Sequence, residues 1–233
     1  MGYYGTGLPE LYGPAGAWPK GRGQPLGCGM DHSSSFCMRV RIPAKSDDTA
    51  APRAEIGNGQ IRAAMYLPDR AKGFYHATRF DWSGVVFSLR HKHHEYYAGP
   101  WFNSTSPSVH DFVYDGPNRI TAGLCSAAVG PVDAFGAIGY DEAAPGGTFV
   151  KIGIGGLLKP DNSSQDDMHL YELATPGTWT VAQRPAAVDF LHELADPSGY
   201  SYSYRKVVSL TEAGMVLQRS LTNTGSKLIN TTV

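Results

Sequence analysis

The clearest pattern in the chain is an alternation of apolar and polar residues near its C-terminus. Over residues 200–210, Tyr200, Tyr202 and Tyr204 fall on one face of the segment and serines fall on the other. A period of two is typical of a half-buried β-strand. Residues 215–221 alternate in the same way, so the sequence predicts two neighbouring strands here.

Residues that favour turns bound both of these strands. The connection 211–214 (TEAG) has hairpin length and ends in a glycine, which tolerates a positive φ. The segment 196–199 (DPSG) precedes the first strand and predicts another hairpin. In the second strand, Arg219 shares a face with Leu217 and Leu221.

Short apolar runs separated by turn residues continue upstream, and no window holds a sustained helical stripe. Residues 186–194 (AAVDFLHEL) come nearest to one, and a strand fits them equally well. We therefore predict an all-β fold, an antiparallel β-sandwich that spans residues 53–233. The other runs assigned to strands are 60–66, 84–89, 148–154 and 179–181.

The first 52 residues have a different composition. Residues 1–30 contain nine glycines and four prolines, and residues 44–52 (AKSDDTAAP) have the composition of a linker. Such a segment has high backbone entropy and few side chains to bury. We expect an irregular, disordered or loosely draped segment over residues 1–52.

Composition and charge exclude some classes of function. The 233 residues carry 20 Lys and Arg against 21 Asp and Glu, so the net charge is −1. No basic excess is present to neutralise a phosphate backbone, which disfavours nucleic-acid binding. No apolar stretch approaches the roughly 20 residues of a membrane-spanning helix. Three cysteines do not make a disulfide framework, and no leader peptide is evident, so the compartment stays open.

Two groups of residues have metal-ligand chemistry. His91, His93 and His94 lie in RHKHHEYY, and further candidates in the glycine-rich segment are Cys28, His32 and Cys37. Neither group contains a paired CxxC, and histidines on a surface turn explain the first group better. We therefore predict no metal site and no cofactor.

His169 is the candidate for acid–base chemistry. It lies in QDDMHLYEL, directly after a polar Pro/Asn/Ser/Asp segment. A histidine that enters a strand from such a loop can lie at the rim of a cleft and exchange a proton near neutral pH. Nearby carboxylates can tune it, namely Asp166, Asp167 and Glu172. The alternative is an ordinary exposed histidine at a loop edge.

A second group has the chemistry of sugar binding. Arg79, Asp81 and Trp82 lie together in TRFDWSG, and Trp179 in GTWTV offers a further aromatic plane. A guanidinium and a carboxylate hydrogen-bond to hydroxyls, and an indole covers the C–H face of a sugar ring. The alternative is that the tryptophans fill the core while Arg79 and Asp81 pair at a strand end.

The order of these segments resembles that of the galactose mutarotase-like superfamily, which includes the aldose 1-epimerases. The similarity covers most of residues 53–233, and the segments that carry it include TRFDWSGVVFSL, DMHLYEL, GTWTV and GYSYSYRKVVSLTEAGMVLQRSLTNTG. His169 followed by Trp179-x-Val181 is similar to the early active-site histidine of that family and the strand after it.

The resemblance implies a supersandwich fold and interconversion of the α and β anomers of free sugars. In that family a glutamate removes the proton of the anomeric hydroxyl and a histidine protonates the ring oxygen, without a cofactor. This chain stops at INTTV, before the positions of the second histidine and the glutamate. We therefore expect a domain incomplete at its C-terminus, with doubtful activity and an exposed sheet edge that favours association of two copies.

Three functions remain open. The first is an aldose 1-epimerase-like isomerase with His169 as its catalytic residue and Arg79, Asp81, Trp82 and Trp179 as substrate-binding residues. The second is a non-catalytic carbohydrate-binding β-sandwich that uses the same residues. The third is an accessory domain of a polysaccharide-processing enzyme. All three functions imply a carbohydrate ligand.

Overall fold

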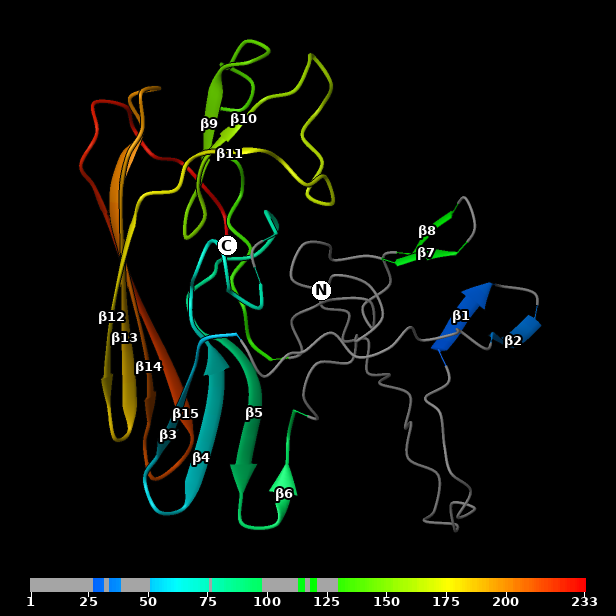
Figure 1. The fold of residues 1–233 in the computed structure, drawn as a ribbon, viewed down its shortest axis with the longest axis vertical. Coiled ribbons are helices and arrows are strands. Elements are labelled where there is room, and N and C mark those ends of the chain that lie inside the picture. The colour runs from blue at the N-terminus through cyan, green and yellow to red at the C-terminus, as the bar shows by residue number, and fades with distance from the viewer. Residues whose placement is uncertain are drawn as a thin grey trace, which may run out of the picture. The chain divides into compact units, whose positions relative to one another are not determined.

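The computed structural model describes residues 27–31, 34–38, 51–75, 77–97, 113–115, 118–120 and 130–233. The chain divides into two compact units, Met1–Arg41 and Ile42–Val233. Every secondary-structure element assigned in the described residues is a β-strand, and every strand pair is antiparallel (Figure 1). The predicted all-β class is therefore confirmed. In the same residues no helix has the length and apolar character to cross a membrane.

The first unit contains one described hairpin. Its strands are β1 (Gly27–Asp31) and β2 (Ser34–Met38), and their register places Cys28 opposite Cys37. The prediction for residues 1–52 falls mainly outside the described residues, as does His32.

A four-stranded sheet forms the first part of the second unit. Its order is β3 (Arg53–Gly57), β4 (Ile61–Tyr66), β5 (Val85–His91) and β6 (His94–Glu95). The turn between β3 and β4 is held by Asn58, whose Oδ1 accepts hydrogen bonds from the backbone N–H groups of Gln60 at 3.0 Å and Ile61 at 2.8 Å. In β4, alternate residues from Ile61 onward are buried, as expected of a strand with one face on the core.

The second four-stranded sheet is built from the strongest pattern in the sequence. Its order is β12 (Thr178–Arg184), β13 (Ala187–Ala195), β14 (Ser201–Leu210) and β15 (Met215–Asn223). The two predicted hairpins connect β13 to β14 and β14 to β15. The ambiguous segment 186–194 is a strand, because its alternate residues pack inward.

A smaller three-stranded sheet carries the loop that contains His169. Its order is β11 (Leu173–Thr175), β10 (Gly155–Leu158) and β9 (Thr148–Lys151). Residues 159–172 connect β10 to β11 and form an extended loop. The remaining pair in this unit is β7 (Val113–Asp115) with β8 (Asn118–Ile120).

One apolar cluster joins the two four-stranded sheets. Phe190 of β13 packs so closely against the start of β5 that a Cβ on Gly84 would lie 3.0 Å from its ring. This contact between sheets is consistent with the predicted β-sandwich. The buried residues of the cluster are Ala54, Ile56, Ile61, Ala63, Met65 and Val86 from the first sheet and Val188, Phe190, Val208 and Leu210 from the second.

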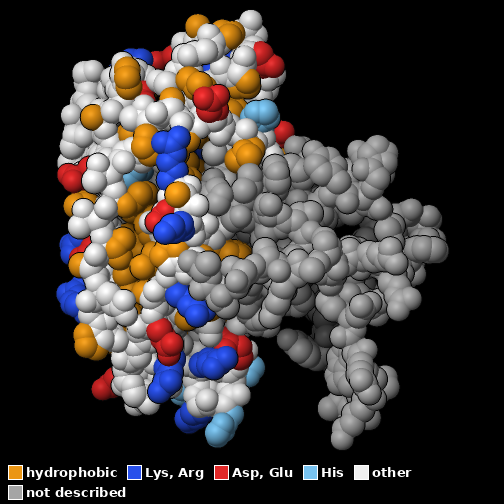
Figure 2. All heavy atoms as spheres, in the orientation of Figure 1, with side chains coloured by type: hydrophobic (Ala, Val, Ile, Leu, Met, Phe, Trp, Pro, Cys, Tyr) orange, Lys and Arg blue, Asp and Glu red, His pale blue; other side chains and the backbone are white. Residues whose placement is uncertain are grey.

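Charged side chains of both signs are intermixed on the face of the described residues drawn in Figure 2. That face shows no continuous basic patch among these residues, in agreement with the net charge of −1. A surface of this kind gives no electrostatic preference for a polyanion.

Candidate functional site

Thr78 joins two segments that lie 91 residues apart in the sequence. Its hydroxyl donates a hydrogen bond to the carbonyl oxygen of His169 at 3.0 Å and accepts one from the backbone N–H of Tyr171 at 3.2 Å. The 159–172 loop is therefore attached to the chain just before Arg79, and two of the predicted site residues are brought to one region.

Arg79 lies half-buried against this loop. Its Cζ is 4.6 Å from the centroid of the Phe80 ring, and its Nη1 is 3.6 Å from the sulfur of Met168. The guanidinium makes no ion pair within the described part of the chain. Stacking on Phe80 restricts the side chain and leaves most of its donors for another molecule.

A tight turn orders residues 166–169. The backbone N–H of His169 donates to the carbonyl oxygen of Asp166 at 3.0 Å, and that of Met168 donates to Asp166 Oδ1 at 2.8 Å. The phenolic oxygen of Tyr171 accepts from the Asp166 N–H at 2.9 Å, and burial raises the pKa of Tyr171 to about 12. The turn is thus fixed from the core side by a neutral phenol.

Lys151 fixes the next residue of the turn. Its ammonium group lies 3.0 Å from Asp167 Oδ1 and also donates to the carbonyl oxygen of Arg79 at 3.3 Å. The lysine side chain is 1% exposed, whereas that of Asp167 is 58% exposed. Burial alone would raise the pKa of Asp167, but the hydrogen bond from Gln165 and the charge of Lys151 outweigh it and lower that pKa.

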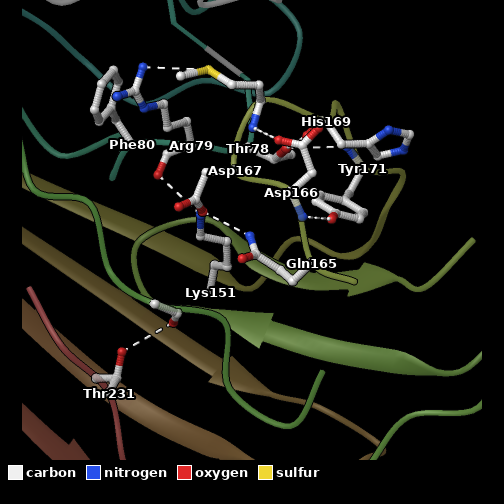
Figure 3. Close-up of polar contacts among 12 residues, drawn as sticks. Thr78, Arg79, Phe80, Lys151, Gln165, Asp166, Asp167, His169, Tyr171 and Thr231 are labelled. Atoms are coloured by element: carbon white, nitrogen blue, oxygen red, sulfur yellow. Dashed lines mark hydrogen bonds and ion pairs between the residues drawn. The ribbon is translucent and has the colours of Figure 1, made fainter. Parts of the chain in front are cut away.

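His169 is exposed at the end of this turn. Its ring meets the Tyr171 ring edge-on with centroids 4.5 Å apart, and neither nitrogen has a hydrogen-bond partner among the described residues. Figure 3 shows the imidazole pointing outward, away from the Lys151–Asp167 ion pair. We call the surface formed by Arg79, Asp166, Asp167, Met168 and His169 the rim.

Asp81 points away from the rim into the protein. It is 1% exposed and accepts hydrogen bonds from the Ser83 N–H at 2.7 Å, Tyr204 Oη at 3.1 Å and Lys206 Nζ at 3.2 Å. It forms no ion pair with Arg79 within the described residues. Its carboxylate is therefore fully occupied by internal donors.

Asp81 belongs to a buried charge network that links loops to the second four-stranded sheet. Lys206 Nζ lies 3.1 Å from Asp133, which also pairs with Arg219 at 2.7 Å. Burial alone would raise the pKa of Asp133, but the Arg219 hydrogen bond and the charge of Lys206 lower it. Two carboxylates and two cations balance one another here, as buried charges require.

Trp82 and Trp179 also lie in structural positions. Trp82 is 3% exposed, and its Nε1 donates to the carbonyl oxygen of Ala77 at 2.8 Å. Trp179 is half-buried and stacks on the His192 ring, with centroids 4.3 Å apart and planes 8° apart. Its Nε1 is buried without a hydrogen-bond partner among the described residues.

His192 itself is fully buried behind Trp179. Its Nδ1 lies 2.9 Å from Tyr202 Oη, and its Nε2 lies 2.9 Å from the carbonyl oxygen of Pro176. Burial lowers the pKa of His192, only partly opposed by the Pro176 hydrogen bond and the charge of Asp81. This imidazole is therefore a neutral member of the core.

The histidines of RHKHHEYY lie on the hairpin between β5 and β6, and Cys28 and Cys37 lie on β1 and β2 in the other unit. Across the part of the chain that the structure describes, no group of three or more His, Cys, Asp or Glu residues could hold a metal ion.

A shallow surface hollow occurs at the β3–β4 hairpin, lined by Glu55, Ile56, Gly57, Gly59 and Arg62. None of the predicted site residues line it. Comparison of the sequence with protein-family models, with curated proteins and with solved structures found no match.

Besides Thr78, sequence reasoning missed three residues that organise this region. Lys151 and Met168 became relevant only through contacts with the 78–81 segment, which local patterns do not reveal. Lys206 carried a usable signal, because the alternation along β14 places it on the same face as Tyr204 and Val208. A lysine on the buried face of a strand predicts a buried anion opposite it.

Proposed function

We propose that this chain binds free sugars on the rim and is a β-sandwich of the galactose mutarotase-like kind. The observation that carries the proposal is the juxtaposition made by Thr78. It attaches the backbone of His169, whose exposed ring nitrogens have no partner among the described residues, to the residue directly before Arg79.

The chemistry of the rim suits a sugar. Arg79 donates hydrogen bonds, the carboxylates of Asp166 and Asp167 accept them, and the imidazole of His169 can do either. The thioether of Met168 lies next to the guanidinium and offers an apolar contact to the C–H face of a ring. Polar groups around an apolar side chain match the amphipathic character of a pyranose.

The structure limits which of the residues predicted to bind the sugar can contact it. Asp81 and Trp82 have their polar atoms bonded within the protein, and Trp179 stacks on His192. In this proposal those three residues support the scaffold, and of the residues that the sequence predicted for the site, Arg79 and His169 contact the sugar.

A second candidate function is interconversion of sugar anomers. The exposed imidazole of His169 favours it, because such a group can give a proton to a ring oxygen. The reaction also needs a base for the anomeric hydroxyl. Among the rim residues, that role would fall to the carboxylate of Asp166 or of Asp167.

The first test is binding. Titration of the full chain with glucose, galactose and mannose, followed by saturation-transfer NMR and calorimetry, should give saturable binding. His169→Ala and Arg79→Met should each weaken it at least about ten-fold, a loss of about 1.4 kcal/mol. Arg205→Met is the matched control, because Arg205 is an exposed arginine on β14 that pairs with Asp189. Absence of binding to every sugar, or equal losses in all three variants, would refute the proposal.

The second test separates binding from catalysis. Polarimetry of freshly dissolved α-glucose or α-galactose should show a rate above buffer only if the rim performs acid–base chemistry. An added rate that disappears in His169→Ala supports the isomerase. Saturable binding without an added rate supports a carbohydrate-binding module.

A further inference from the structure

The β5–β6 hairpin places two histidines directly opposite one another. The connection consists of Lys92 and His93 alone, and the register pairs His91 with His94 and Arg90 with Glu95. Lys92 has a φ of 55°, the left-handed conformation that a two-residue hairpin turn demands. The turn therefore fixes the register of the pair.

Directly paired residues on antiparallel strands project from the same face, with Cβ atoms about 4.5–5.5 Å apart. His94 is exposed and His91 is half-buried. The His94 ring meets the Tyr96 ring edge-on at 4.4 Å, which restricts its orientation. Neither imidazole makes a hydrogen bond or an ion pair within the described residues.

The carboxylate of the adjacent Glu95 is already engaged. Glu95 accepts hydrogen bonds from Ser88 Oγ at 3.0 Å and the Leu89 N–H at 2.9 Å, and it pairs with Arg90. Burial alone would raise the pKa of Glu95, but the hydrogen bonds from Arg90 and Ser88 lower it. The groups left to meet a ligand are thus the two imidazoles.

We propose that His91 and His94 form a site for one divalent transition-metal ion, with water completing its coordination. Imidazole nitrogens suit Zn²⁺, Cu²⁺ and Ni²⁺, and they bind at about 2.0–2.1 Å for zinc. The spacing of a direct cross-strand pair lets both rings reach one ion. Two protein ligands leave the other coordination positions open, and affinity rises from Ni²⁺ to Cu²⁺.

Metal titration of the full chain tests the proposal, after treatment with a chelator and its removal. Cu²⁺ and Ni²⁺ are the probes, with calorimetry for affinity and paramagnetic broadening of the histidine ring signals for location. The rings of His91 and His94 should broaden first. Each single alanine variant should lose at least about ten-fold in affinity, since even an outer-sphere partner of a metal is worth that much.

His93→Ala is the matched control, because His93 lies in the same turn but outside the cross-strand pair. It should keep the affinity of the unmodified chain within about two-fold. If His93→Ala and His94→Ala lose affinity equally, or if only other histidines broaden, the proposal is wrong. His94 is exposed, so its replacement leaves the fold intact even if His91→Ala does not.

Discussion

Replacement of Lys206 by methionine removes a cation that lies between two buried carboxylates. The Lys206 side chain is 0% exposed, and its Nζ contacts Asp81 at 3.2 Å, Asp133 at 3.1 Å and the carbonyl oxygen of Ser83 at 2.9 Å. Methionine fills a similar volume, so the perturbation is mainly electrostatic. Arg219 still pairs with Asp133 in the variant, whereas Asp81 loses its cation.

The expected cost follows from that orphaned charge. Removal of one partner of a buried ion pair destabilises a protein by about 3–5 kcal/mol, because the remaining charge stays buried without compensation. Arg205→Met is the control, since Arg205 adjoins Lys206 on β14 and forms an exposed pair with Asp189. Exposed pairs contribute about 0–1 kcal/mol.

Urea unfolding followed by fluorescence and circular dichroism measures both variants. Lys206→Met should lower the midpoint by roughly 1–5 M, given slopes of about 1–3 kcal/mol per molar urea. Addition of Asp81→Asn to Lys206→Met should recover about 0.5–3 kcal/mol, because it removes the orphaned charge. A cost below about 1 kcal/mol for Lys206→Met, or one equal to that of Arg205→Met, would refute this reasoning.

Two further predictions concern backbone space and acid stability. Gly153→Ala should destabilise the protein by more than about 2 kcal/mol, because the new Cβ would lie 2.3 Å from Asp81 Oδ1 at a φ of +74°. Gly146→Ala is its control, with a φ of +79° but no atom within 4 Å, and urea midpoints compare the two. Burial lowers the folded-state pKa of His192 below its ordinary 6.5, so its contribution to stability is complete above pH 6.5 and is lost as pH falls below it. The lowered pKa of Asp133 adds a further loss below pH 3.8. Urea midpoints that rise from pH 7.5 to pH 5.5 would contradict the sign for His192, and midpoints that rise as pH falls below 3.8 would contradict the sign for Asp133.

The strands of the second four-stranded sheet were predictable because the sequence features that indicate them lie within short segments. Alternation of side chains and the turn residues at 196–199 and 211–214 are properties of short segments, and they determine β13 to β15. The same alternation placed Arg219 on the face of its leucines, where the structure shows it pairing with Asp133.

The site was less predictable because it depends on contacts between distant segments. Arg79 and Asp81 lie two residues apart in sequence, yet one reaches the rim and the other enters the buried network. That difference depends on Lys206, which lies 125 residues from Asp81 and is reached only after the sheets pack. Likewise, the sequence identified His169 but not the Thr78 hydroxyl that attaches its loop.

The most direct test of the central claim is the response of individual histidine rings to sugar. NMR spectra that resolve the imidazole signals can be followed while glucose or galactose is added to the full chain. The proposal predicts that the His169 ring shifts in a saturable way and that the shift disappears in Arg79→Met, while the distant His94 ring stays unchanged. An unmoved His169 ring at sugar concentrations that saturate binding would contradict it.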